Sequence, residues 1–82
     1  MKQLDGYGPA IIGPAFIWNG NERVQVLVYN AEAMRFILER RDGMTSEEAR
    51  EFIEFNIENA YVGPDTPVLV WIDDTFWLTP NA

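Results

Sequence analysis

Arg23-Val24-Gln25-Val26-Leu27-Val28-Tyr29-Asn30 joins a strand pattern to a helix start, so it sets the fold class. The three valines alternate along the stretch and predict a β-branched face that packs in the core. The side chains between them form a mixed face, which we expect to be half exposed. Asn30 is a favourable N-cap, because its side-chain oxygen can accept hydrogen bonds from first-turn amides. A strand followed directly by a helix is therefore predicted.

A β-hairpin is predicted just before this point. Ala15-Phe16-Ile17-Trp18 has the content of a strand, and Asn19-Gly20-Asn21-Glu22 separates it from residues 23–29. Asn-Gly is a strong hairpin signal, because both residue types accept positive φ. Pro14 cannot donate a ladder hydrogen bond, so we expect the first strand at a sheet edge or at a bulge. Residues 1–10 hold turn formers and predict an irregular lead-in.

Two helices are predicted in the middle of the chain. The first runs from Ala31 to about Arg41, with Gly43 placed to end it in the left-handed conformation. The second begins at a capping box, in which Thr45 caps the amide of Glu48 and Glu48 reaches back to Thr45. Gly63-Pro64 is expected to stop this helix. Its apolar face repeats at intervals of three and four residues: Ala49, Phe52, Ile53, Asn56, Ile57 and Ala60.

Two further strands are predicted near the end of the chain, at residues 68–72 and 75–78, with Asp73-Asp74 as the turn between them. The resulting order is strand, strand, helix, helix, strand, strand. We therefore expect an α+β fold of two layers, ββααββ, with a four-stranded, largely antiparallel sheet and both helices on one face. Residues 1–82 are expected to form a single small acidic domain.

The composition excludes several classes of protein. Hydrophobic residues make up 48% and charged residues 23%, which is unlike a disordered polar tail. The longest apolar run, residues 68–72, is far short of the roughly 20 residues that cross a bilayer, so no membrane partner is expected. Cysteine and histidine are absent, which excludes disulfides, thiolate zinc sites and imidazole bases. Residues 1–5 lack a signal-peptide pattern, so we expect a cytoplasmic location.

Charge bears on the kind of partner. Six basic and thirteen acidic residues give a net charge of -7, and the basic residues are scattered. Direct binding to nucleic acid is therefore not expected, because it draws on clustered Lys and Arg. A negative field favours a basic partner and speeds encounter with it. The alternative is that negative charge serves only solubility.

An outer aromatic face is predicted on the sheet. If Val68, Val70 and Ile72 face the helices, then Leu69 and Trp71 face the other way, and Tyr29 and Leu27 belong with them. Trp77 can lie on either face. The candidate partner-binding residues are Tyr29, Leu69, Trp71 and Trp77, since an exposed apolar patch of this size is typical of a homodimer seam or a target-binding face. The alternative is that the N-terminal segment covers these rings.

An acidic face is predicted on the second helix, where Glu47, Glu51, Glu54 and Glu58 align opposite the apolar stripe and Glu48 lies beside them. Such a row of carboxylates approaches the charge density of one DNA strand, so it could act as a nucleic-acid mimic. The alternative is an ordinary solvated helix face, with its repulsions partly relieved by Arg50.

Neither catalysis nor cofactor binding is expected. Asp73-Asp74 supplies too few oxygen ligands for a hard cation, so no metal site is predicted. Ser46 lies in a predicted first helical turn with no general base expected beside it. Phosphate loops and dinucleotide motifs are absent, since the glycines lie in Gly-Pro pairs or turns. We therefore expect a protein that is not an enzyme.

Several stretches together resemble a group of small uncharacterised proteins common in bacteriophage and prophage genomes. The matching segments are Asp5-Gly6-Tyr7, Ala10-Ile11-Ile12-Gly13, Arg41-Asp42-Gly43-Met44-Thr45, Glu47-Glu48-Ala49, Glu54-Phe55-Asn56-Ile57, Ala60-Tyr61-Val62-Gly63 and Thr66-Pro67. The likeness covers most of residues 5–67, whereas the chain runs on through Trp71 and Trp77, where that group tends to end sooner. The resemblance implies a phage-type origin and an αβ fold, and it carries no catalytic residue across.

These observations predict a phage-type protein that binds a host protein in the host cytoplasm and could inhibit host defence or metabolism by steric occlusion. The outer aromatic face would supply affinity and the acidic face would steer the encounter. Two alternatives stay open at this point: an acidic nucleic-acid mimic, and a structural homo-oligomer such as a minor virion or assembly component. A homodimer through the outer aromatic face also stays open.

Overall fold

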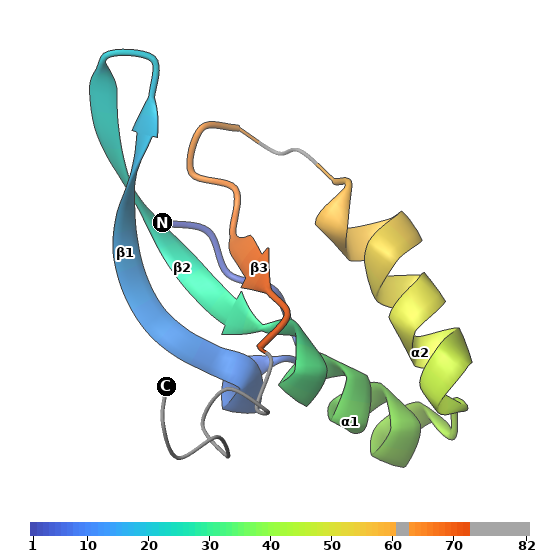
Figure 1. Cartoon of the computed structure of the whole chain (residues 1–82). Helices are drawn as coiled ribbons and strands as arrows, with labels where there is room; N and C mark the ends of the chain where they lie inside the picture. Colours follow the sequence, from blue (N-terminus) through green and yellow to red (C-terminus); the bar gives the residue numbers. More distant parts are fainter. Residues whose placement is uncertain (61–62, 73–82) are drawn as a thin grey trace, which may run out of the picture.

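The computed structural model describes residues 1–60 and 63–72 (Figure 1). A 3-10 turn, η1 (Gly8–Ala10), precedes the strands β1 (Ile11–Asn19) and β2 (Glu22–Asn30). The helices α1 (Ala31–Asp42) and α2 (Ser46–Ile53) follow, and α2 continues into the π-helical segment η2 (Glu54–Glu58). The described chain ends with the short strand β3 (Val68–Val70) and two residues after it.

The predicted hairpin is confirmed, with longer strands than expected. β1 and β2 pair antiparallel from Asn19 opposite Glu22 back to Ile11 opposite Tyr29. Gly20 is the first residue of the two-residue loop and has a φ of 64°. A type II′ turn places glycine at this first position, where φ is positive. Among the described residues only glycines have positive φ, so one loop residue and not both adopts it. The pairing register shifts between Ile11 and Gly13, which confirms the bulge expected beside Pro14.

Local signals also define both helix starts. The side chain of Asn30 accepts hydrogen bonds from the amides of Glu32 and Ala33, and Gly43 ends α1 with a φ of 68°. The capping box of α2 is confirmed, since Thr45 accepts from the Glu48 amide over 3.1 Å and the Glu48 carboxylate accepts from the Thr45 amide over 2.9 Å. These contacts hold each helix start in place without any tertiary contact.

The end of the second helix differs from the expectation. The α-helical pattern gives way to η2 at Glu54, and Asn59 caps the segment well before Gly63. The Asn59 side chain donates to the Glu54 carbonyl over 2.6 Å, which satisfies one of the free carbonyls at the helix end. The wider turn brings Ile57 against the core while Asn56 is exposed. The predicted placement of Asn56 on a buried apolar face is therefore wrong.

The sheet differs from the predicted four-stranded, largely antiparallel ββααββ sheet. Within residues 1–60 and 63–72 it has three strands in the order β1-β2-β3, and β3 runs parallel to β2, with Val28 opposite Val68 and Tyr29 opposite Leu69. Figure 1 shows the reason: α1 leads away from the end of β2, and α2 returns past the sheet before the chain enters β3. A crossover through two helices permits a parallel return, whereas the prediction took the sheet to be largely antiparallel. The predicted strand at residues 75–78 lies outside the described residues.

The face of the sheet that meets the helices is the opposite of the predicted one. Leu27 and Tyr29 are buried in a core cluster with Met34 and Leu38 of α1 and Ile53 of α2. Val26 is buried on the other side, while its neighbours at alternate positions, Val24 and Val28, are half-buried. Rings and leucine bury more apolar area per side chain than valine, so they gain more from the helix-covered side. The valine face was therefore wrongly predicted to meet the helices.

The N-terminal segment completes this core, as the alternative interpretation of the rings expected. Tyr7 is buried in the core cluster and Leu4 packs against it. The Arg41 guanidinium lies 5.3 Å from the centre of the Tyr7 ring and donates to the Gly6 carbonyl over 3.1 Å. Lys2 pairs with Asp65, which ties the lead-in to the segment before β3. Residues 1–10 are thus irregular but anchored at both ends.

The hairpin extends as an arm beyond the packed part of the molecule (Figure 1). The Cα radius of gyration is 14.1 Å, compared with about 12 Å for a compact chain of this length. The described chain measures 39 × 37 × 19 Å, so it is broad and thin. The far half of the hairpin consequently has little of the described part of the chain packed against it.

Candidate protein-binding surface

The predicted outer aromatic face is not an outer face. Tyr29 has a relative exposure of 0%, and its hydroxyl accepts a hydrogen bond from the Leu4 amide over 2.8 Å. Leu69 and Trp71 are half-buried and pack against the core cluster. Trp77 lies outside the described residues. The exposure predicted for Tyr29, Leu69 and Trp71 is wrong, because their side of the sheet faces the helices.

Two other aromatic rings are exposed on the hairpin. Phe16 and Trp18 of β1 have relative exposures of 59% and 71%. They lie two residues apart on one strand, so both rings point to the same side of the sheet. We call them the hairpin pair. Sequence reasoning placed both in a strand but missed them as a surface, and the available signal was their alternation with Ala15 and Ile17.

The strand register defines the surroundings of the hairpin pair. Trp18 lies opposite Arg23 and Phe16 lies opposite Gln25. The Arg23 guanidinium sits 4.6 Å from the centre of the Phe16 ring, a cation–π distance. Pro14 and Leu27 continue the same side toward the core. The hairpin pair therefore lies on the same side of the sheet as Leu27 and Tyr29, at the end near the hairpin turn, where the helices do not cover the sheet.

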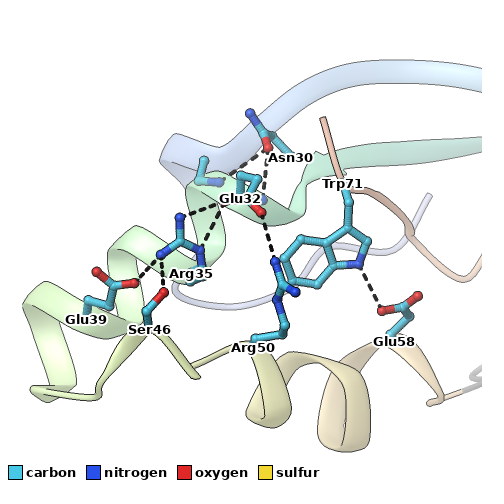
Figure 2. Close-up of polar contacts among 9 residues, drawn as sticks. Asn30, Glu32, Arg35, Glu39, Ser46, Arg50, Glu58 and Trp71 are labelled. Carbon is cyan, nitrogen blue, oxygen red and sulfur yellow. Dashed lines mark hydrogen bonds and ion pairs between the residues drawn. The ribbon is translucent and has the colours of Figure 1, made fainter. Parts of the chain in front are cut away.

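A polar cluster joins the two helices to the end of β3 (Figure 2). Arg35 donates to the carboxylates of Glu32 and Glu39 and to the Ser46 hydroxyl. The hydrogen bonds that Arg35 donates to the Glu32 carboxylate are the main reason that the pKa of Arg35 lies above its ordinary value. The cluster bridges α1 to the first turn of α2, so its evident effect is to fix the angle between them.

Arg50 and Trp71 extend this cluster to the sheet. The Arg50 guanidinium lies 5.4 Å from the centre of the Trp71 ring and 3.8 Å from the Glu32 carboxylate. The Trp71 indole N–H donates to Glu58 over 3.2 Å (Figure 2). Trp71 thus has a partner on its ring face and a partner at its nitrogen, which accounts for a half-buried indole that needs no further ligand.

The acidic face of the second helix divides into engaged and free carboxylates. Glu58 accepts from Trp71, and Glu48 serves the capping box, where the hydrogen bond from the Thr45 amide lowers its pKa. Glu47, Glu51 and Glu54 are exposed, and their carboxylates make no hydrogen bond or ion pair within the described part of the chain. Three of the predicted acidic-face residues therefore present free charge to solvent, while Glu58 is turned toward β3.

The described surface has shallow hollows. An open groove of about 310 Å³ along α2 and η2 is lined by residues that include Glu48, Glu51, Phe52 and Phe55. A smaller cavity of about 100 Å³ is mostly apolar and has Asn56, Thr66 and Pro67 in its lining. Both are smaller or more open than the clefts that enclose most of a small ligand.

The described residues contain no group of three or more His, Cys, Asp or Glu side chains arranged to hold a metal ion. Within residues 1–60 and 63–72, no helix combines the length and apolar content that a bilayer crossing requires. Comparisons with protein-family models, with curated proteins and with solved structures found no match to this chain.

Proposed function

We propose that this chain is a phage-type binding protein that attaches to a host protein through the hairpin pair and acts by covering a surface of that protein. One observation carries the proposal: Phe16 and Trp18 leave most of their ring area open on the same side of one strand. Burying such rings contributes much of the affinity at protein interfaces, because they cover large area with few rotatable bonds. The proposal assigns no catalytic residue.

The free carboxylates of Glu47, Glu51 and Glu54 support a role in steering. They lie on a different element from the hairpin pair, on a chain with a net charge of -7. Charges outside the buried centre of an interface mainly change the association rate. We therefore propose a host partner with an apolar pocket and a basic rim, met in the host cytoplasm. We further propose host defence or metabolism as the process affected, on the phage-type origin that the resemblance implies.

The direct test is capture from a lysate of the native host with three immobilised proteins: wild type, Trp18→Ala and Phe36→Ala. Phe36 is the matched control, because it is also an exposed ring but lies on α1 and away from the hairpin. A protein held by wild type and by Phe36→Ala, and lost with Trp18→Ala, supports the proposal. Equal recovery with all three proteins contradicts it.

The nucleic-acid mimic remains the second candidate, and the free carboxylates are the observation that favours it. A mimic would compete with DNA or RNA for a basic partner, so its binding would fall steeply between 0.05 and about 0.5 M salt. Binding through the hairpin pair, with the carboxylates only steering the encounter, would change no more than several-fold over that range. The triple change of Glu47, Glu51 and Glu54 to Gln would abolish binding by a mimic, whereas it would weaken binding through the hairpin pair only several-fold at low salt, by slowing association.

A further inference from the structure

The outer edge of β1 is open among the described strands. Of the strands that the structure describes, β1 has only β2 as a neighbour in the sheet, and none of its nine residues, Ile11–Asn19, is charged. Exposed edge strands normally carry charges, prolines or bulges that prevent another strand from pairing with them. Here Pro14 and the bulge protect the first half. The second half, residues 15–19, has no such protection.

The register shows which backbone groups face outward. Asn19 and Glu22 flank a two-residue loop, so they form a hydrogen-bonded pair, and bonded pairs then alternate along the ladder. Ala15 and Ile17 therefore bond to β2, while the N–H and C=O groups of Phe16 and Trp18 point away from it. The position of Pro14 agrees, since the missing N–H falls at an outward site.

The charge distribution favours a second copy of this chain as the partner that pairs with the outer edge of β1. The hairpin, residues 11–30, contains only Glu22 and Arg23 as charged residues, so its formal charge is zero within a chain of -7. Two hairpins can therefore approach edge to edge without placing like charges opposite each other. A strongly basic or acidic strand would find no complementary charge on this edge. The acidic α2 and η2 lie on the far side of the described molecule from β1 (Figure 1).

We propose that two copies pair their β1 strands antiparallel about a two-fold axis at Ile17. In this register residues 15–19 of one copy pair with residues 15–19 of the second copy, and Pro14 and the bulge lie outside the paired segment. Phe16 then lies opposite Trp18 of the second copy. The outward N–H and C=O groups of each of these two residues form hydrogen bonds with the C=O and N–H groups of the other. The paired rings fall on one side of a continuous sheet. The inference deepens the proposed function, because the binding surface becomes a four-ring surface that one copy alone does not complete.

The exposed area sets the expected strength. With Phe16 and Trp18 at 59% and 71% exposure, each copy offers roughly 250 Å² of aromatic surface, in addition to the strand edge. Such an interface falls in the small and weak class. The dimer should consequently dissociate on dilution, with a dissociation constant on the order of micromolar.

Disulfide trapping tests the register. The chain has no cysteine, so Ile17→Cys introduces a single thiol at the two-fold axis, where opposed Cα atoms of a non-bonded pair are about 4.5 Å apart and can be bridged. Val24→Cys is the control: it lies opposite Ile17 on β2, which puts the two thiols three strand spacings, about 14 Å, apart. Light scattering over a concentration series reports the mass of the wild-type protein.

A concentration-dependent dimer mass together with a disulfide-linked dimer of Ile17→Cys, and none of Val24→Cys, would support the pairing. A monomer at every concentration, or a dimer that Ile17→Cys does not cross-link, would overturn it. Comparing Phe16→Pro with Phe16→Ala separates the contribution of the backbone edge to dimerisation from that of the ring. Both variants remove the ring, but only proline removes the outward N–H. Capture of a host protein that requires Trp18 would survive a failure of this pairing, so the two proposals fail independently.

Discussion

The backbone N–H of Leu4 donates a hydrogen bond to the hydroxyl of Tyr29 over 2.8 Å. Tyr29 is fully buried, so this contact satisfies the one polar atom that the ring carries into the core. It also closes the N-terminal segment over the sheet side that β2 and β3 share. Tyr29, which was expected to bind a partner, therefore helps to hold the N-terminal segment over the helix-covered side of the sheet.

The first prediction concerns this contact. Tyr29→Phe keeps the ring and removes the acceptor of the Leu4 amide, so the free energy of unfolding should fall by about 1 kcal/mol. Tyr29→Ala should cost about 3 kcal/mol or more, because it also leaves a cavity. Urea denaturation measures both. Equal stability of wild type and Tyr29→Phe would show that the hydrogen bond does not contribute.

The second prediction contrasts two tryptophans. Trp71→Ala should lower the free energy of unfolding by about 2 kcal/mol, since Trp71 packs on the core and contacts Arg50 and Glu58. Trp18→Ala should change it by less than about 0.5 kcal/mol, because that ring is mostly in solvent. Thermal melts monitored by circular dichroism compare the two. A large destabilisation by Trp18→Ala would mean that the hairpin pair serves the fold.

The third prediction is a pH dependence at the capping box. The folded state lowers the pKa of Glu48, mainly through the Thr45 amide. The carboxylate form is therefore favoured on folding, so its stabilising effect is present above the unfolded pKa of about 4.3 and is lost as pH falls through the lower folded pKa. Melting temperatures of wild type and Glu48→Gln should converge in that acidic window.

Two further variants serve as comparisons for the capping-box measurement. Glu47→Gln removes the same charge from the same turn without removing a hydrogen bond to a described residue, so it controls for net charge. Thr45→Ala should lower the free energy of unfolding by about 1 kcal/mol through loss of the N-cap. A constant difference between wild type and Glu48→Gln from pH 3 to about pH 7 would argue against the linkage.

The fourth prediction concerns steering. Changing Glu47, Glu51 and Glu54 together to Gln should slow association with the host partner several-fold at low salt and leave the dissociation rate unchanged. Surface plasmon resonance at two ionic strengths separates the two rates. An association rate that is the same for wild type and the triple variant at low salt would show that the acidic face does not steer the encounter.

Features set by neighbouring residues were predictable from the sequence. The Asn30 cap, the Gly43 helix end, the capping box and the hairpin each depend on a few consecutive residues, and all of them form as expected. The direction of β3 and the side of the sheet that meets the helices depend on contacts distant in sequence. Alternating valines could not decide that side, because Leu27 and Tyr29 form an equally apolar face on the same strand.

The candidate site was missed for the same reason. The rule that exposed rings and other large apolar side chains mark an interface led to Tyr29, Leu69 and Trp71, and the reversed sheet side buried or half-buried all three. The rule itself applies to Phe16 and Trp18, whose exposure follows from where the helices stop covering the sheet. That boundary depends on how the helices pack against the sheet, which contacts distant in sequence determine and local sequence patterns did not indicate.

The central claim is that the hairpin pair is a binding surface and not a part of the core. Calorimetric titration of the captured host protein with wild type, Trp18→Ala and Phe36→Ala tests it most directly. We expect Trp18→Ala to bind at least about tenfold more weakly, equivalent to about 1.4 kcal/mol, and Phe36→Ala to bind as wild type does. Wild-type affinity in Trp18→Ala would contradict the claim.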